Sequence, residues 1–347
     1  MQARQKNANT AKKIAIVGCG AITESAHLPA ALRSSLIEVT ALVDSNINNA
    51  AALARRYALH CPICKDLNEV VENVDGVIIA TPNSTHFYLG EIALSRGVPV
   101  LIEKPLTTKY ADSVRLCSMA EKNNTFISVG YVSRYYPSIL LMKKLLQSKF
   151  FGEIRSFHYE FGSMGGWEPI SGYNIHRSMA GGGTLVITGT HFLDRMLYWF
   201  GEPKEFTYED DNYGGVEANC KARLLFENDL GKFSGTFFMS KTISLRNKFI
   251  IDCEKYVCEL DEFQKQSLTL FPKENSSLKI ELTSRETNKH NDVDYFQVQL
   301  ESFVKQIQNK GCIKVDGWFG ARSVKLIEEM YKKRSPLSES WSTHWKI

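Results

Sequence analysis

The sequence has almost no excess of charge of one sign. Its 347 residues include 42 lysines and arginines against 38 aspartates and glutamates, a formal net charge of +4. The basic residues are dispersed and are not interleaved with aromatic residues along one face, so the electrostatic pattern of a nucleic-acid-binding protein is missing. No apolar stretch is long enough to span a bilayer. We therefore expect neither nucleic acid nor a membrane as a partner.

The eight cysteines show no disulfide framework. Cys61 and Cys64 make one Cys-x-x-Cys pair, and no second pair follows at the spacing of a zinc site, so we expect no metal. A basic start followed by apolar residues 14–22 imitates a secretory signal, but the residues that follow have the pattern of a glycine turn and a helix. We expect residues 1–12 to be a disordered tail and the protein to be cytoplasmic, where thiols stay reduced.

Residues 13–34 have the order strand, glycine turn and helix that is typical of a dinucleotide-binding fold. Gly18 would make the tight turn after the strand, and Gly20 would let the backbone approach a pyrophosphate at the helix N-terminus. Thr23 occupies the third position of the fingerprint, where Gly or Ala is usual, so the motif is imperfect. The predicted pyrophosphate-binding residues are Gly18, Gly20, Ala21 and Ile22.

A second strand, Glu38 to Asp44, ends in a carboxylate about twenty residues after the glycine turn. At this point of a dinucleotide fold, an acid accepts hydrogen bonds from the adenosine ribose and would repel a 2′-phosphate. Asp44 therefore predicts NAD as the cofactor in preference to NADP. The alternative is a strand-end aspartate that only caps a turn.

Two further apolar strands, residues 75–80 and 98–103, are separated by a helical pattern over residues 87–96. This alternation predicts a doubly wound parallel sheet, whose ligands bind at the carboxyl ends of the strands. Lys104 follows the last of these strands and precedes a proline that fixes the backbone, so we expect it to donate a proton there. The alternative is a strand-end lysine that points into solvent. The other residues expected to border the cofactor here are Thr81, Pro82, Asn83, His86 and Glu103.

The rest of the chain predicts a second domain of different architecture, with a large, mostly antiparallel open sheet. The α/β chain would thus have a Rossmann domain at residues 13–131 and an α+β domain at residues 132–347. The open face of the second sheet is the expected surface for a homodimer or homotetramer. The pattern predicts strands at residues 153–161, 218–226, 231–239 and 247–258, and helices at residues 294–308 and 320–333.

The order of these motifs resembles the glucose-fructose oxidoreductase, inositol dehydrogenase and MocA family over nearly the whole chain. The glycine turn, Asp44, residues 80–83 and Glu103-Lys104-Pro105 carry the resemblance. In the family, the lysine of Glu-Lys-Pro lies beside the nicotinamide, and the peptide bond before the proline is often cis. Further matches are His27-Leu28-Pro29, Val129-Gly130-Tyr131, Arg134, Pro137, Gly181-Gly182-Gly183-Thr184-Leu185, Gly189, His191 and Asp194.

The resemblance implies an oxidoreductase that transfers a hydride between NAD(P) and a hydroxyl or keto carbon of a sugar, a cyclitol or a nucleotide-linked sugar. Lys104 and His191 would serve as its catalytic acid and base. The family lines its substrate pocket with the polar segment just before the triple glycine, although that segment also fits an ordinary loop. The implied substrate-binding residues are Arg134, Tyr173, His176, Arg177, Thr188 and His191.

One residue departs from the family pattern. The family has an aspartate four residues before the histidine, and this chain has Ile187 there. If residues 184–199 form a helix, positions 187 and 191 share a face, so the usual orienting carboxylate is missing. His191 is then either an acid–base catalyst or a packed helix residue, and the chain is either an enzyme or a dinucleotide-binding sensor without turnover. The retained Lys104 and His191 favour the enzyme, because a sensor needs no proton donor beside the nicotinamide.

Overall fold

The computed structural model describes residues 11–164, 172–283 and 291–337. These residues form two compact units. The first contains residues 11–132 and 291–324, and the second contains the described residues of 133–283 together with 325–337. The sequence-based division, with a single second domain over residues 132–347, differs from this because residues 291–324 pack within the first unit.

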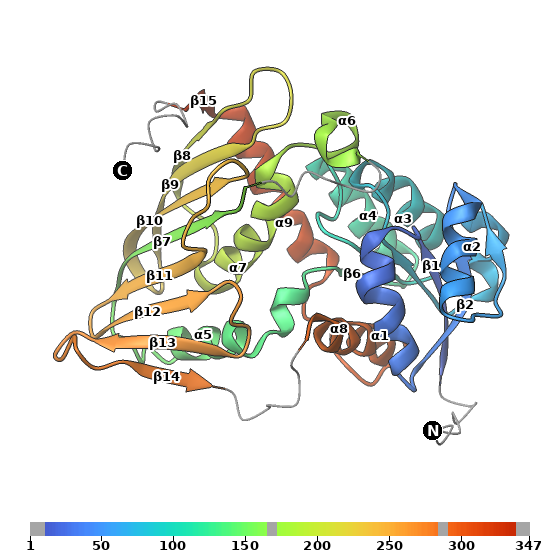
Figure 1. The fold of residues 1–347 in the computed structure, drawn as a ribbon, viewed down its shortest axis with the longest axis horizontal. Coiled ribbons are helices and arrows are strands. Elements are labelled where there is room, and N and C mark those ends of the chain that lie inside the picture. The colour runs from blue at the N-terminus through green and yellow to red at the C-terminus, as the bar shows by residue number, and fades with distance from the viewer. Residues whose placement is uncertain (1–10, 165–171, 284–290, 338–347) are drawn as a thin grey trace. The chain divides into compact units, whose positions relative to one another are not determined.

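The first unit is built on a parallel sheet of strands β1 (Lys12–Val17), β2 (Ile37–Val43), β3 (Ile63–Cys64), β4 (Gly76–Ile79), β5 (Val100–Ile102) and β6 (Ile127–Val129). Their order is β3-β2-β1-β4-β5-β6, which confirms the predicted doubly wound sheet. Strands β1, β2 and β6 are labelled in Figure 1. Because the order reverses between β1 and β4, ligands of such a sheet bind beyond the carboxyl ends of these strands. The predicted tail lies outside the described residues except at its end, where Lys12 begins β1.

Helix α8 (Asp292–Ile307) explains why the chain returns to the first unit. The ring of Phe296 on α8 packs edge-on against His27, with centroids 5.0 Å apart, and Asp294 pairs with Arg33 at 3.1 Å. The apolar face of α8 is therefore buried by this unit. The other helices are η1 (Thr23–His27), α1 (Leu28–Arg33), α2 (Ile47–Arg56), α3 (His86–Ser95) and α4 (Tyr110–Lys122), with 3-10 turns η2 (Leu67–Glu69), η3 (Val71–Asn73) and η4 (Asn83–Thr85).

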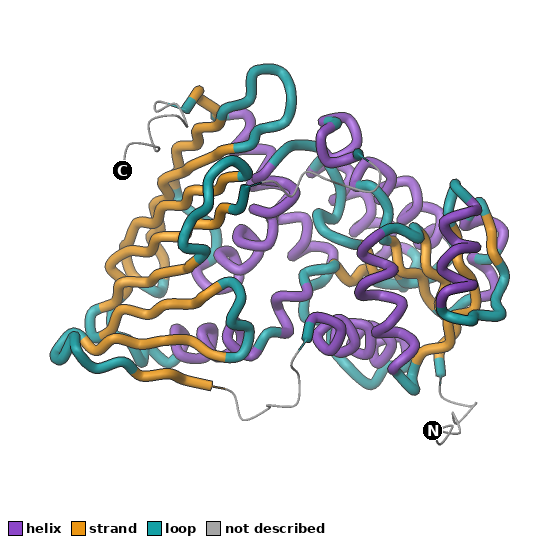
Figure 2. The backbone as a smooth tube through the Cα atoms, viewed as in Figure 1, coloured by secondary structure: helices purple, strands orange, loops and turns teal. Residues whose placement is uncertain are grey.

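The second unit contains the predicted large sheet, with strands β7 (Ile154–Gly162), β8 (Glu205–Asp210), β9 (Asn219–Asn228), β10 (Gly231–Ser240), β11 (Lys248–Cys253), β12 (Tyr256–Asp261), β13 (Ser267–Pro272), β14 (Ile280–Thr283) and β15 (Arg334–Pro336). The order is β14-β13-β12-β11-β7-β10-β9-β8-β15, mostly antiparallel, with parallel pairs β7–β10 and β8–β15 (Figure 1). Figure 2 shows the strands of this sheet in orange. The predicted strand at residues 247–258 is two strands, because the chain reverses at Glu254 and Lys255.

The helices of the second unit include α5 (Pro137–Gln147), η6 (Tyr173–Ile175), α6 (Arg177–Ala180), η7 (Leu185–Gly189) and α7 (Thr190–Phe200). The 3-10 turn η5 (Val132–Tyr135) lies where the chain leaves the first unit, and α9 (Gly317–Lys332) runs through both. Aromatic rings hold α7 on the sheet: Phe192 stacks on Tyr159 at 4.2 Å and Phe200 on Phe157 at 5.1 Å between centroids. This packing fixes the helix that carries His191.

Over the described ranges, no helix is long and apolar enough to cross a membrane. In the same ranges, no group of three or more His, Cys, Asp or Glu side chains is arranged to hold a metal ion.

Candidate active site

The glycine turn after β1 has the shape that a dinucleotide cradle requires. Gly18 has φ +91°, and a Cβ at this position would collide with the carbonyl of Ala80 in the loop after β4. Gly20 has open space where its Cβ would be, and Ala21 and Ile22 are exposed. The backbone of the turn is thus accessible, as the approach of a pyrophosphate demands.

Thr23 fills the third position of the fingerprint without strain on its polar group. Its side chain is fully buried, and its hydroxyl donates to the carbonyl oxygen of Gly18 at 2.5 Å. The turn that follows is a π-helical one, η1, in place of a regular α-helical start. The hydroxyl therefore stabilises the glycine turn by a hydrogen bond. A glycine at this position would only allow close packing of the helix on the strand.

Asp44 joins the end of β2 to the glycine turn. Its Oδ2 accepts from the backbone N–H of Cys19 at 2.8 Å, and its Oδ1 accepts from that of Asn46 at 2.8 Å. Both sequence interpretations thus have a basis here, since the carboxylate shapes a turn and also lies beside the predicted pyrophosphate site. A carboxylate offers about four lone-pair sites, so capacity remains for ribose hydroxyls.

The backbone at Lys104 is held by a buried carboxylate. Glu103 is 8% exposed, and its side chain lies 2.8 Å from Nε2 of His27 and accepts from the N–H of Lys104 at 3.1 Å. Burial acts to raise the pKa of Glu103, but the hydrogen bond with His27, the nearby charge of Lys104 and the N–H of Lys104 together lower that pKa. The bond between Lys104 and Pro105 is cis. His27, the first residue of the His27-Leu28-Pro29 motif, therefore supports the backbone at Lys104 through Glu103.

His86 does not line an open surface, contrary to the expectation that it binds the cofactor. It is fully buried, with Nδ1 2.9 Å from the carbonyl oxygen of Pro105 and Nε2 3.0 Å from that of Thr81. Burial lowers its pKa, although both carbonyls oppose this. His86 thus links the loops after β4 and β5. Of the other predicted residues in the first loop, Asn83 is buried, while Thr81 and Pro82 are half-buried.

Arg134, an expected substrate ligand, is in the interior of the second unit. Its guanidinium is 2% exposed, lies over the ring of Tyr198 at 3.8 Å and makes two bonds to the carboxylate of Asp194, at 2.6 and 3.0 Å. A buried pair with this fork geometry compensates both charges. We therefore correct the sequence interpretation: Arg134 anchors η5 to α7.

The remaining predicted substrate residues lie on the second unit's helices. Thr188 and His191 are half-buried on η7 and α7, and Tyr173 is half-buried in η6. His176 and Arg177 are exposed where α6 begins.

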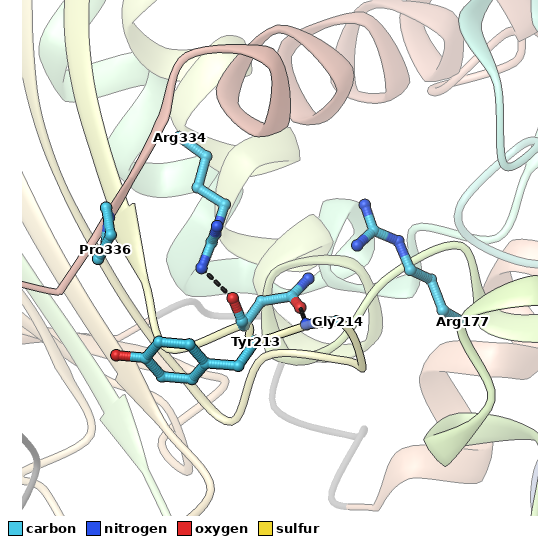
Figure 3. Close-up of a pocket in the computed structure, with 6 residues that line it drawn as sticks. Arg177, Tyr213, Gly214, Arg334 and Pro336 are labelled. Atoms are coloured by element: carbon cyan, nitrogen blue, oxygen red, sulfur yellow. Dashed lines mark hydrogen bonds between the residues drawn. The ribbon is translucent and has the colours of Figure 1, made fainter.

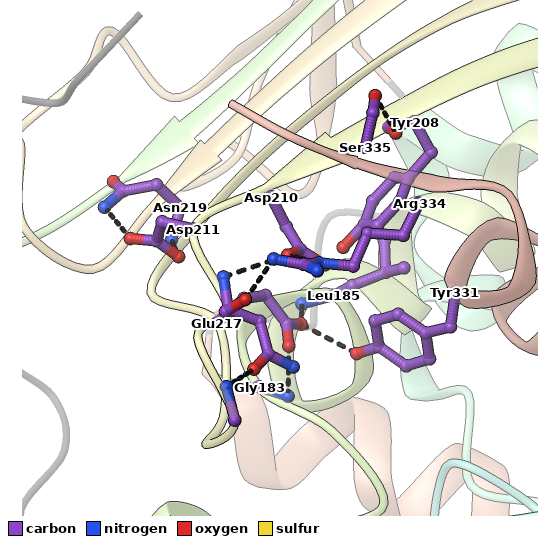
Figure 4. A network of polar contacts seen from close by, with 12 residues as sticks. Gly183, Leu185, Tyr208, Asp210, Asp211, Glu217, Asn219, Tyr331, Arg334 and Ser335 are labelled. Atoms are coloured by element: carbon purple, nitrogen blue, oxygen red, sulfur yellow. Dashed lines mark hydrogen bonds and ion pairs between the residues drawn. The ribbon is translucent and has the colours of Figure 1, made fainter. Parts of the chain in front are cut away.

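A network that the sequence did not reveal explains two of the three consecutive glycines, Gly182 and Gly183 (Figure 4). The buried carboxylate of Glu217 accepts from the N–H groups of Gly183 and Leu185, both at 2.9 Å, and from the hydroxyl of Tyr331 at 2.7 Å. Burial raises the pKa of Glu217. A Cβ at Gly183 would collide with the Glu217 backbone, and one at Gly182 with the Tyr331 hydroxyl. Glu217 thus caps the helical segment that carries the predicted residues Thr188 and His191.

Comparison with known proteins agrees with this geometry. Residues 12–131 match the family model described as an oxidoreductase family with an NAD-binding Rossmann fold, and residues 139–257 match the GFO/IDH/MocA C-terminal domain. The chain is 29% identical over 195 residues to the rhizopine catabolism protein MocA of Rhizobium meliloti, a match that spans 56% of this chain and 59% of that protein. It is 23% identical over 342 residues to the D-glucoside 3-dehydrogenase of Escherichia coli (strain K12), covering 92% and 94% of the two chains.

A solved structure shares the whole fold. The levoglucosan dehydrogenase in complex with NADH and levoglucosan has a TM-score of 0.82 and 18% identity, covering 93% of this chain and 96% of that one. Two models of the same family match the larger part of the chain, one before and one after the point at residues 132–133 where the chain passes from the first unit to the second. The chain therefore belongs to the Gfo/Idh/MocA family of oxidoreductases with an NAD-binding Rossmann domain.

Proposed function

We propose that this protein is an NAD-dependent dehydrogenase or ketoreductase that acts on a CH–OH or keto carbon of a sugar, a cyclitol or a nucleotide-linked sugar. The observation that carries the proposal is the position of Lys104. It follows β5 at the carboxyl edge of the parallel sheet, next to β4 and the reversal of strand order, where such sheets bind ligands. The names of relatives such as the D-glucoside 3-dehydrogenase support a carbohydrate substrate.

NAD, when bound, accepts or supplies the hydride, and the chain's own residues do the rest. The glycine turn would hold the pyrophosphate, Asp44 would bind the ribose, and Thr81, Pro82 and Asn83 would border the cofactor. The ammonium of Lys104 exchanges the hydroxyl proton and stabilises negative charge that develops on the substrate oxygen. His191 is the second acid–base group. Tyr173, His176, Arg177 and Thr188 bind the substrate.

Absorbance of reduced nicotinamide tests the proposal with a panel of sugars, cyclitols and nucleotide-sugars. We expect turnover with at least one class of these compounds. If NADH binds, as followed by its fluorescence, while every class fails in both directions, the protein is a dinucleotide-binding sensor instead, as the absence of a carboxylate at Ile187 would allow.

Asp44→Asn is expected to lower the preference for NADH over NADPH by about tenfold or more. The amide keeps an oxygen that can accept from the N–H of Cys19, while the negative charge that repels a 2′-phosphate is removed. Fluorescence titration with NADH and with NADPH gives both dissociation constants without any substrate. An unchanged ratio of the two constants would show that the ribose is read elsewhere.

We also propose that two chains pair through the face of the second sheet opposite to α7. Along β11, Phe249 and Ile251 are buried in the core, so Ile250 points to the other face and is only half-buried. Beside it on that face, Lys248 and Glu259 pair across strands at 2.7 Å. A half-buried apolar side chain with polar neighbours fits an interface, since a whole interface is only about as apolar as the rest of a protein's surface.

Ile250→Glu is expected to convert the assembly to monomers, because it places a charge in the centre of this face. Light scattering coupled to size exclusion measures the mass. Ser277→Glu, which adds the same charge in the exposed connection between β13 and β14, should leave the mass unchanged. The interface lies elsewhere if the Ile250 variant keeps the wild-type mass.

A further inference from the structure

The second unit contains a cavity of about 470 Å³ whose lining has, apart from Arg177, no role in the site described above (Figure 3). Its wall comes from three parts of the chain that are distant in sequence: the start of α6, the connection between β8 and β9, and strand β15. The lining residues are Arg177, Asn212, Tyr213, Gly214, Arg334 and Pro336.

One wall of the cavity is rigid. Arg334 donates from Nε to the fully buried carboxylate of Asp210 and from Nη2 to the carbonyl oxygen of Asn212 (Figure 4). The same Asp210 accepts from the N–H of Asn212 at 2.9 Å, and the side chain of Asn212 accepts from the N–H of Gly214 at 2.7 Å. The guanidinium of Arg334 is therefore fixed before any ligand arrives, which lowers the entropic cost of binding.

The two arginines of the cavity carry more N–H donors than the neighbouring acceptors of the protein bond. A guanidinium carries five N–H donors, and the bonds of Arg334 occupy two of them. Within the described part of the chain, the exposed guanidinium of Arg177 makes no hydrogen bond or ion pair and lies only near the ring of Tyr331, at 5.7 Å. Figure 3 shows its side chain extending from α6 toward the connection that carries Tyr213 and Gly214.

The charge balance of the cavity is positive. Asp210 compensates Arg334, whereas the charge of Arg177 has no counterpart among the described residues. The neighbouring carboxylate of Asp211 is turned into the loop, where it accepts from the N–H groups of Ala218 and Asn219 at 2.8 and 2.9 Å. Planar guanidinium groups with unused N–H donors match the oxygens of phosphate and carboxylate groups.

We propose that this cavity binds an oxyanion, a phosphate or a carboxylate group, carried by a small molecule. Its assignment to the anionic end of the sugar substrate rests on the function proposed above, while the anion site itself does not depend on that function. Arg177 supplies the uncompensated charge, and Arg334 supplies the fixed donors.

Calorimetric titration of the full chain with sodium phosphate and with sodium acetate, at low ionic strength and with saturating NAD, tests the site. The saturating NAD keeps phosphate away from the glycine turn. We expect binding of at least one anion, weakened tenfold or more in Arg177→Gln and less in Arg177→Lys. Arg177 is exposed, and among the described residues its guanidinium has no hydrogen-bond or ion-pair partner to lose, so the variant should fold.

Arg155→Gln is the matched control, because it removes another exposed arginine of the same unit, on β7. It should bind both anions like the wild type. The proposal is overturned if the wild type binds neither anion, or if Arg177→Gln binds them as the wild type does. The relative affinities for phosphate and acetate decide which oxyanion the site takes.

The assignment to the substrate has a separate readout. We expect kcat/KM for a sugar phosphate to exceed that for the parent sugar, and Arg177→Gln to reduce this ratio tenfold or more. Equal kcat/KM values for the two compounds would overturn the assignment to the substrate. Anion binding without turnover of any sugar would instead retain the site and overturn the proposed function.

Discussion

Lys104→Ala is expected to lower kcat by about 10²–10⁴-fold, the usual contribution of a positioned acid–base group. NADH affinity should stay within a few-fold of the wild type, because the ammonium acts mainly when negative charge develops in the transition state. Steady-state kinetics with the best substrate of the panel gives kcat and KM, and NADH fluorescence gives the dissociation constant. Near-normal turnover in this variant would refute the proposed role.

Lys109→Ala is the matched control, since Lys109 is exposed and follows in the same segment, just before α4. It should leave kcat and KM unchanged. Glu103→Gln tests whether the Glu103 carboxylate positions Lys104. The amide oxygen can still accept from the N–H of Lys104, but the negative charge that faces His27 is lost. We expect it to lower kcat less than Lys104→Ala does.

The first unit could be predicted well because its signals are local. Strands β1, β2, β4 and β5 are each followed by a short motif, and the alternation of strands and helices leaves few possible topologies. Gly18 and Asp44 follow directly after β1 and β2, and Lys104 lies two residues after β5, so the sequence alone places them at one edge of the sheet. The resemblance to the family also indicated the cis bond before Pro105, which the structure contains.

The interactions that hold the site could not be predicted, because they join residues far apart in the chain. His27 and Glu103 are 76 positions apart, and Gly183 is 34 positions from the carboxylate of Glu217. Hydrophobic periodicity indicates which face of an element is buried, but it does not indicate which distant polar groups meet there. An arginine such as Arg134 therefore looks available for a ligand until its buried partner is known.

A regular helix over residues 184–199 would place Ile187 and His191 on one face, but the structure differs at that point. Residues Leu185–Gly189 form a π-helical turn, so the bonding pattern changes just before His191. Such a turn widens the helix by one residue and alters which side chains share a face. Hydrophobic periodicity cannot show this change, since it carries no information on the contacts that Gly182 and Gly183 make with Tyr331 and Glu217 just before the turn.

Arg134→Met is expected to lower the free energy of unfolding of the protein by about 3–5 kcal/mol, because it leaves the carboxylate of Asp194 buried without its partner. Asp194→Leu should cost a similar amount for the converse reason. The double variant Arg134→Met with Asp194→Leu removes both charges, so it should be more stable than either single variant. Denaturant unfolding followed by fluorescence measures all three.

The same variants separate the structural role of Arg134 from the substrate-binding role that its sequence position implied. An arginine that only binds substrate would leave the unfolding midpoint of Arg134→Met unchanged and would lower kcat/KM in the double variant as much as in the single one. If Arg134 is a buried anchor, the unfolding midpoint of Arg134→Met should fall. The double variant should then recover part of both kcat/KM and stability, because no buried charge is left without its partner. Arg155→Met is the control, because Arg155 is an exposed arginine on β7. This substitution should change the free energy of unfolding by less than about 0.5 kcal/mol. The Arg134 side chain is 2% exposed and its two bonds to Asp194 use the fork that a substrate carboxylate or phosphate would need, so the loss of stability should dominate.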